Sequence, residues 1–131
     1  MMPRLAIGIG CRKGCSGDAV AGLVRRALAM ADLSEQEMAL FTSEAKRGEA
    51  GLAAAAAALG LDLVLLSHAA LLAAAPRCVT HSLRVEALTG LPSLAEAAAL
   101  AGAGAASRLI LPRISKAGAS CAIAIQEGLL L

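Results

Sequence analysis

Residues 4–18 read RLAIGIGCRKGCSGD, and the rest of the chain can be ordered around this stretch. Leu5, Ile7 and Ile9 alternate with small residues, which is the period of a buried strand. Ser16 is a preferred helix N-cap, and the acidic residue two positions later suits the first turn of a helix. The stretch therefore predicts a strand, a tight turn and the start of a helix.

The turn between this strand and this helix has the composition of an anion site. Gly8, Gly10 and Gly14 allow backbone with positive φ and close approach by a ligand. Arg12 and Lys13 lie on the same turn, beside the free N–H groups and the positive end of the expected helix. We therefore expect an anion to bind here, although the stretch alone does not indicate which one.

Length and composition narrow the class of protein. The 131 residues suit a single domain, 1–131, and a net charge of +2 is too small to indicate DNA binding by itself. Phe41 is the single aromatic residue, which argues against a module that stacks nucleic-acid bases. No apolar run reaches the roughly 18 residues needed to span a bilayer. Four cysteines without an export signal are expected to be reduced thiols, so we expect a cytoplasmic protein with no nucleic-acid or membrane partner.

Helical and strand-like patterns alternate along the chain. They predict an α/β fold: a single three-layer α/β/α domain with a mainly parallel sheet, whose last two strands pair as a C-terminal hairpin at one edge. Residues 77–90 show no firm period and are expected to form a long loop. The expected helices span residues 16–31, 52–59, 67–75 and 93–103, and the strands after the first span residues 38–42, 61–66, 108–111 and 119–125.

The polar loops of this largely apolar chain are expected to lie side by side along one rim of the fold. Ligands of such folds bind beyond the carboxyl ends of the strands, where we place residues 10–16, 43–51 and 112–118. In the second loop, Lys46 supplies a cation for an anionic ligand and Glu49 a carboxylate for proton transfer. The alternative is that both are merely solvated loop charges.

Three further charged residues have two interpretations each. Glu96 follows Ser93 by three positions, which forms a helix capping box, and we prefer this role to contact with a ligand. Arg113 and Lys116 either decorate a hairpin turn or add to the cations of the rim. With them, four or five cations would suit a ligand that has several carboxylates.

Other chemistries fit the residues poorly. The first glycines give GxGxxxG, one residue longer than the dinucleotide fingerprint, and no acid ends the second expected strand. Cys11 and Cys15 lack the second ligand pair that a structural zinc site needs. No serine or cysteine nucleophile lies at a recognisable spacing from His68 or His81, so the sequence predicts no catalytic triad. We therefore expect no metal and no cofactor.

Four segments carry a family resemblance: residues 8–14 (GIGCRKG), 46–52 (KRGEAGL), 90–100 (GLPSLAEAAAL) and 111–124 (LPRISKAGASCAIA). The first three resemble the main motifs of the CobE family of cobalamin-biosynthesis proteins and of the C-terminal domain of the longer protein CbiG. The fourth segment is similar to the last hairpin of that family, so the likeness covers nearly the whole chain in order. Cys15 departs from the family by replacing a residue that is more often a hydroxyl, and Arg113 stands where lysine is common.

The resemblance implies a role in building the corrin ring of vitamin B12. CbiG-type proteins open a ring lactone in cobalt-precorrin-5A and release acetaldehyde, and the stand-alone CobE type belongs to the aerobic route. We expect this chain to bind a polycarboxylate precorrin intermediate, with hydrolysis of a precorrin lactone as its activity if it is an enzyme. Lys46 would then polarise a carbonyl or carboxylate, and Glu49 would act as acid and base. The expected substrate contacts are Gly10, Cys11, Arg12, Lys13, Gly14, Ser16, Glu96, Arg113 and Lys116.

Two alternatives from other classes stay open. The first glycine turn could serve a nucleotide-binding α/β enzyme. The alanine-rich helices expected at residues 52–59 and 94–103 could instead give flat faces for docking onto another enzyme of the B12 pathway, or onto a second copy in a homo-oligomer.

Overall fold

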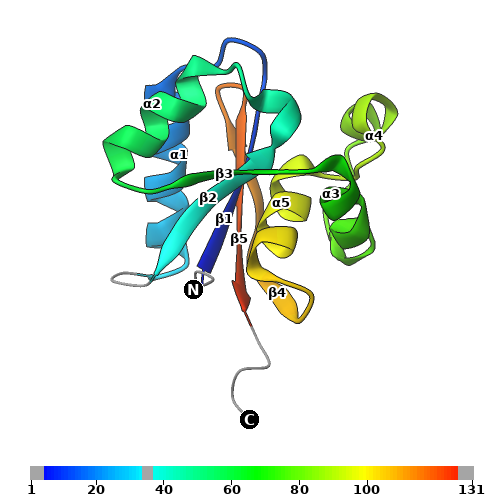
Figure 1. Cartoon of the computed structure of the whole chain (residues 1–131). Helices are drawn as coiled ribbons and strands as arrows, with labels where there is room; N and C mark the ends of the chain where they lie inside the picture. The colour runs from blue at the N-terminus through cyan, green and yellow to red at the C-terminus, as the bar shows by residue number, and fades with distance from the viewer. Residues whose placement is uncertain (1–4, 34–36, 127–131) are drawn as a thin grey trace.

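The computed structural model describes residues 5–33 and 37–126. Its strands form one five-stranded sheet in the order β3-β2-β1-β5-β4 (Figure 1). The sheet is mixed, because β1 pairs with β2 and β2 with β3 in parallel, whereas β5 is antiparallel to both β1 and β4. The strands are β1 (Leu5–Cys11), β2 (Met38–Ser43), β3 (Leu63–Leu66), β4 (Ser107–Lys116) and β5 (Ala119–Gln126).

Helices cover both faces of the sheet, which confirms the expected α/β fold with three layers. Helices α1 and α2 pack on one face, and α3 and α5 pack on the other (Figure 1). The expected C-terminal hairpin is also present, with β4 at the edge of the sheet. The helices are α1 (Gly17–Met30), α2 (Ala50–Leu59), α3 (His68–Ala74), α4 (Leu83–Thr89) and α5 (Leu94–Ala103), with short 3-10 turns η1 (Glu44–Lys46) and η2 (Ala75–Arg77).

The alternation along β1 divides the core into two halves. Ile7, Ile9 and Cys11 face α1 and α2, where they join a cluster of larger apolar side chains. Ala6, on the opposite face, joins a cluster built mostly from alanines of α5. Because alanines and glycines meet on that side, α5 approaches the sheet more closely than larger side chains would allow.

Gly8 shows how close this approach is. A Cβ atom at Gly8 would lie 1.8 Å from the Ala95 carbonyl oxygen and 2.5 Å from the Ala99 amide nitrogen. Gly8 and Gly10 have no positive φ; within the first glycine motif only Gly14 does, at 79°. Of the three glycines that allow a positive φ, only Gly14 therefore adopts one. Gly8 is a packing residue.

Two other local predictions were wrong. Part of the expected loop at residues 77–90 forms η2 and α4, a short helix without buried residues that ends at Gly90 in the left-handed region. Its exposed sequence carries no apolar period, so the pattern could not reveal it. The strand expected at residues 108–111 continues past Pro112 to Lys116, because register shifts toward β5 accommodate the proline.

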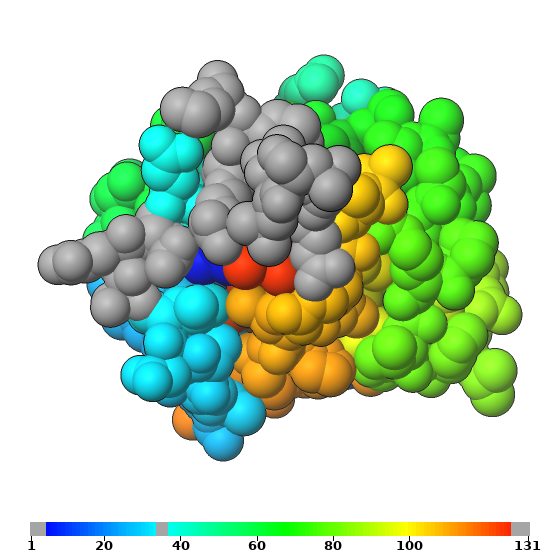
Figure 2. All heavy atoms as spheres, turned by 90° about the horizontal axis from the view of Figure 1, so that it is seen from below, coloured from blue at the N-terminus to red at the C-terminus, as the bar shows by residue number. Residues whose placement is uncertain are grey.

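At the end of the sheet where β1 begins, the start of β1 lies next to the end of β5 (Figure 2). Leu5 pairs with Ile125, and the pairing runs without a break to Cys11 and Ala119. In the part of the chain that is described, no helix is both long and apolar enough to cross a bilayer.

Candidate functional site

Three loops meet beyond the carboxyl ends of β1 and β2, and we call this region the rim: residues 12–16, residues 44–49 and the hairpin turn 117–118 (Figure 1). The Arg12 amide donates a hydrogen bond of 2.9 Å to the Gly118 carbonyl. The Gly14 amide donates one of 3.0 Å to Oε2 of Glu49. These two bonds join the first loop to each of the other two, and so confirm that the loops share one rim.

The first two loops are held together by glycines of the helices that follow them. A Cβ atom at Gly51 in α2 would lie 2.1 Å from the Cys15 carbonyl oxygen. One at Gly17 in α1 would lie 2.8 Å from the Cβ atom of Ala54. The first turns of α1 and α2 can therefore touch, and this contact brings Glu49 to the first loop.

The two helix starts are capped in different ways. Ser16 is the N-cap of α1, as predicted, and its Oγ accepts a hydrogen bond of 3.0 Å from the Ala19 amide. Glu49 is the N-cap of α2, but its side chain makes no capping bond. Its carboxylate is directed to Gly14 instead. Glu49 thus occupies the N-cap position of α2 while its carboxylate binds the loop that precedes α1.

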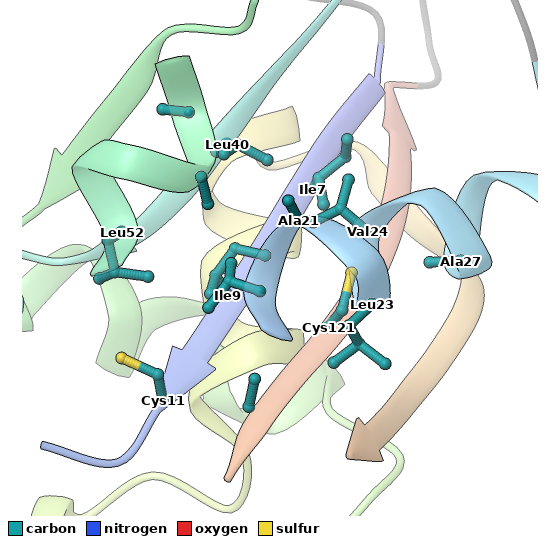
Figure 3. Packing of buried hydrophobic residues seen from close by; sticks show 14 of the residues in the cluster. Ile7, Ile9, Cys11, Ala21, Leu23, Val24, Ala27, Leu40, Leu52 and Cys121 are labelled. Atoms are coloured by element: carbon teal, nitrogen blue, oxygen red, sulfur yellow. The ribbon is translucent and has the colours of Figure 1, made fainter. Parts of the chain in front are cut away.

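Cys11, Cys15, Lys46 and Glu49 share one environment at the end of β1. Burial is the main cause that raises the pKa of the Cys11 thiol to about 12. Cys15 and the Glu49 carboxylate act in the same direction, and the Lys46 ammonium acts against them. Cys11 lies beneath the rim near Leu52 of α2 (Figure 3). Its high pKa keeps it a thiol at neutral pH, so Cys11 forms an apolar floor for the rim.

Lys46 and Glu49 have groups available for a ligand. Both side chains are half-buried. Among the described residues, the Lys46 ammonium has no hydrogen bond or ion pair, and Oε1 of Glu49 has no hydrogen bond. A cation and a carboxylate oxygen without protein partners can bind, polarise or exchange a proton with a bound molecule.

Further cations lie on the loops of the rim or next to them in the sequence. Arg12, Lys13 and Lys116 are exposed, and so is Arg47, which the sequence interpretation did not select. The stem of Arg12 lies against Gly118, at 3.4 Å from a Cβ atom built there. The rim therefore has an excess of positive charge, as expected from the sequence.

Glu96 and Arg113 form a separate group on the α5 face. Oε1 of Glu96 accepts hydrogen bonds of 2.8 Å from the Val79 and Thr80 amides. Oε2 accepts one of 2.6 Å from the Thr80 hydroxyl and one of 2.9 Å from the Arg113 amide. The carboxylate is fully buried.

The capping-box interpretation of Glu96 was therefore half right. Its amide donates to the Ser93 side chain, but its carboxylate ties the segment before α4 to β4 rather than returning to the helix start. Thr80, which supplies two of the bonds, has no sequence signal, because it lies sixteen residues from Glu96 in a segment without a pattern. Gly10, another expected contact, lies inside β1 opposite Leu94.

A family model described as "Cobalamin synthesis G C-terminus" matches residues 5–124. The chain belongs to this family. It is 36% identical over 121 residues to the protein CobE of Sinorhizobium sp, a match that covers 92% of this chain and 79% of that protein. The chain is therefore a cobalamin-biosynthesis protein of the CobE and CbiG C-terminal type.

Solved structures of cobalamin-biosynthesis proteins have the same fold. CobE, a protein from the cobalamin (vitamin B12) biosynthetic pathway, matches with a TM-score of 0.87 and 36% identity over 97% of this chain and 93% of that one. The cobalamin biosynthesis protein chiG of Agrobacterium tumefaciens matches with a TM-score of 0.72 and 37% identity over 95% and 99%. A cobalamin biosynthesis protein G homologue from Sulfolobus solfataricus, at 20% identity and a TM-score of 0.64, shows the fold alone, and this chain spans 38% of it.

Metal-ligating groups do not gather in the described part of this member of the cobalamin synthesis G C-terminus family. Within residues 5–33 and 37–126, no three His, Cys, Asp or Glu side chains lie so that they could hold a metal ion. Cys11, Cys15, Cys78 and Cys121 are all free. The groups that the rim offers are cations, backbone amides and the carboxylates of Glu44 and Glu49.

Proposed function

We propose that the rim binds the peripheral carboxylates of a precorrin or corrin intermediate. The observation that supports this most is the junction of three loops by the Arg12–Gly118 and Gly14–Glu49 hydrogen bonds. Lys46 lies on one of these loops without a protein partner among the described residues, and the other loop residues Arg12, Lys13 and Arg47 are exposed cations. Charge-assisted hydrogen bonds from such cations are the strong contacts that carboxylates make.

A second candidate function is hydrolysis of a precorrin lactone at the same place. The arrangement of Lys46 and Glu49 favours it, because the Gly14 amide fixes one oxygen of Glu49 and leaves the other for a water molecule or a substrate proton. Lys46 would polarise the lactone carbonyl. Water would add at this carbonyl carbon, the ring C–O bond would break, and the proton taken by Glu49 would pass to the leaving oxygen.

The structure weakens the two alternatives from other classes. Gly8, in the glycine motif that suggested a nucleotide, packs under α5, and Ser16 already caps α1. Of the two helices proposed as docking faces, α5 is almost entirely buried, so it has no free face. Helix α2 keeps an exposed alanine face, but it offers no polar group for recognition.

The test is a titration of the purified protein with hydrogenobyrinic acid and a series of precorrins, followed by absorbance and by mass spectrometry of the ligand. Lys46→Ala is expected to weaken binding about tenfold or more, since a hydrogen bond to a charged group contributes about 1.5–3 kcal/mol. Arg25→Ala removes the same charge from an exposed site on α1 outside the rim and serves as the control. The melting temperature of Lys46→Ala should stay near that of the wild type, because its ammonium has no partner to lose among the described residues.

The outcomes separate the two functions. Binding with an unchanged ligand mass supports binding or handover of an intermediate. A gain of one water by the ligand, or loss of a two-carbon unit, supports hydrolysis, and Glu49→Gln should then abolish the change in mass while binding persists. No binding to any member of the series, or equal binding by the wild type and Lys46→Ala, contradicts the proposal.

A further inference from the structure

A pocket of about 220 Å³ lies between the first half of α1 and the hairpin turn that joins β4 to β5. Its walls include Gly22 and Ala117, together with Asp18, Arg26 and Lys116. The pocket adjoins the rim, because the residue after Ala117 in the turn accepts the hydrogen bond from the Arg12 amide. Sites that enclose whole drug-sized ligands measure roughly 300–1,000 Å³. The pocket is therefore sized for one part of a larger molecule.

Two of the residues that form its walls are locally unfavourable choices. Gly22 lies inside α1, where glycine weakens a helix, and a Cβ atom there would meet nothing within 4 Å. Packing therefore gives no reason for a glycine. Ala117 has a φ of 54° and precedes Gly118 with a φ of 82°. This is a two-residue hairpin turn that normally favours asparagine at the first position.

Both choices have the same effect on the pocket, which is to keep it open. A longer side chain at Gly22 would suit the helix but would extend into the pocket, since the space above the backbone is empty. Asparagine at Ala117 would relieve the turn but would also occupy more of the wall. Locally unfavourable residues that gather around one cavity point to a function of that cavity.

The charges of the pocket indicate what would bind there. Arg26 and Lys116 supply two cations against one acid, Asp18, and Asp18 also stabilises the positive end of α1. Among the described residues, none of these three side chains has a hydrogen bond or an ion pair. The guanidinium and the ammonium are therefore available to a carboxylate.

We propose that this pocket is a second subsite, in which Arg26 and Lys116 hold one carboxylate arm of the molecule whose other arms contact the rim. The inference rests on the proposed function for the identity of that molecule. Its chemistry, an aliphatic carboxylate beside Leu23 and Ala19, rests on the pocket alone. The subsite sets which arm of an asymmetric macrocycle enters, because Ala117 belongs both to the hairpin turn of the rim and to the wall of the pocket, so an arm held in the pocket fixes how the other arms lie on the rim.

The pocket is tested first with a small probe that does not depend on the macrocycle. Succinate is titrated into ¹⁵N-labelled protein, with succinamide as the uncharged control. The amides of Gly22, Arg26 and Ala117 should shift in a saturable way with succinate and not with succinamide. Arg26→Gln should weaken the binding at least fivefold, whereas Arg25→Gln, its exposed neighbour outside the pocket, should stay within twofold. Absent shifts, or equal losses in both variants, overturn the subsite.

Two filling variants then connect the pocket to the larger ligand. Gly22→Gln and Ala117→Asn should each raise the melting temperature, because they replace an unfavourable residue, and each should weaken binding of hydrogenobyrinic acid at least fivefold. Hydrogenobyrinic acid bound equally by wild type and both variants overturns the subsite and leaves the proposed function standing. Saturable succinate binding without any binding of the macrocycle supports the subsite and overturns the proposed function.

Discussion

Replacing Glu96 with glutamine tests whether the buried carboxylate joins three segments of the fold. The carboxylate accepts four hydrogen bonds at 2.6–2.9 Å, two on each oxygen. Glutamine has nearly the same shape but offers only one acceptor oxygen. If that oxygen faces Val79 and Thr80, the new NH₂ group faces the Arg113 amide, and two donors then meet in a fully buried place.

The expected loss follows from this change. A buried donor without a partner costs about 1–3 kcal/mol, and the remaining bonds lose the assistance of the charge. We expect Glu96→Gln to lower the free energy of unfolding by about 2–4 kcal/mol, out of the roughly 5–15 kcal/mol typical of a domain. Urea unfolding followed by far-UV circular dichroism measures it. Glu86→Gln is the matched control, because Glu86 is an exposed carboxylate whose contact is a 3.9 Å approach to His81.

The same variant has a pH signature. Burial by itself raises the pKa of the Glu96 carboxyl, but the hydrogen bonds from Thr80, Arg113 and Val79 together lower it below its ordinary value of 4.5. A carboxyl with a lower pKa in the folded state contributes stability above its unfolded pKa, and this contribution is lost as the pH falls through the folded pKa. The difference between wild type and Glu96→Gln should therefore be largest near pH 7 and shrink below pH 4.5.

Two results would refute this reasoning. One is a Glu96→Gln variant within about 0.5 kcal/mol of the wild type at pH 7, since only surface changes are normally so mild. The other is a difference that grows as the pH falls below 4.5. Should Glu96→Gln fail to fold, Thr80→Val, which removes the single 2.6 Å hydroxyl bond, is expected to cost about 1 kcal/mol and carries the test.

Three further predictions concern the packing around the sheet. Gly8→Ala should lower the free energy of unfolding by about 3 kcal/mol or prevent folding, because β1 and α5 would have to separate. Gly10→Ala should be nearly neutral in the same urea assay, because a Cβ atom at Gly10 would lie 3.7 Å from its nearest neighbour. Arg77→Ala should cost about 2 kcal/mol, since the guanidinium donates to the backbone and hydroxyl oxygens of Ser107 at 2.8 and 3.0 Å; an unchanged urea midpoint would refute this. Cys121 should resist iodoacetamide at pH 8 until the protein unfolds, because burial raises its pKa to about 12, and peptide mass mapping would detect any early labelling that contradicts this.

The sequence predicted the features of this fold that depend on local pattern. Alternating apolar residues located β1, and a serine followed by an acidic residue located the start of α1. The rule that ligand loops gather at the carboxyl ends of strands was enough to place Lys46 and Glu49 next to the loop of Gly14. These successes share one cause, since each relies on spacing within a few residues or on general topology.

What the sequence could not predict depends on contacts between distant residues. Gly8 has the same local signal whether it turns the chain toward a ligand or makes room for a helix, and only the position of α5 decides. Glu96 fits the capping-box pattern, yet its carboxylate accepts hydrogen bonds from Val79, which precedes α5 in the sequence, and from Arg113, which follows it. The pocket beside Gly22 and Ala117 likewise arises where a helix meets a hairpin far away in the chain.

The position of β5 also has a consequence for how the protein is made. β1 emerges early in synthesis, but one of its two neighbours in the sheet is β5, which is more than a hundred residues away. Until residues 119–126 have left the ribosome, β1 has one open edge and the Arg12 amide lacks its acceptor in the hairpin turn. Long-range pairings of this kind slow folding and leave strand edges exposed meanwhile. The three-loop junction of the rim can therefore form only after residues 119–126 have been translated.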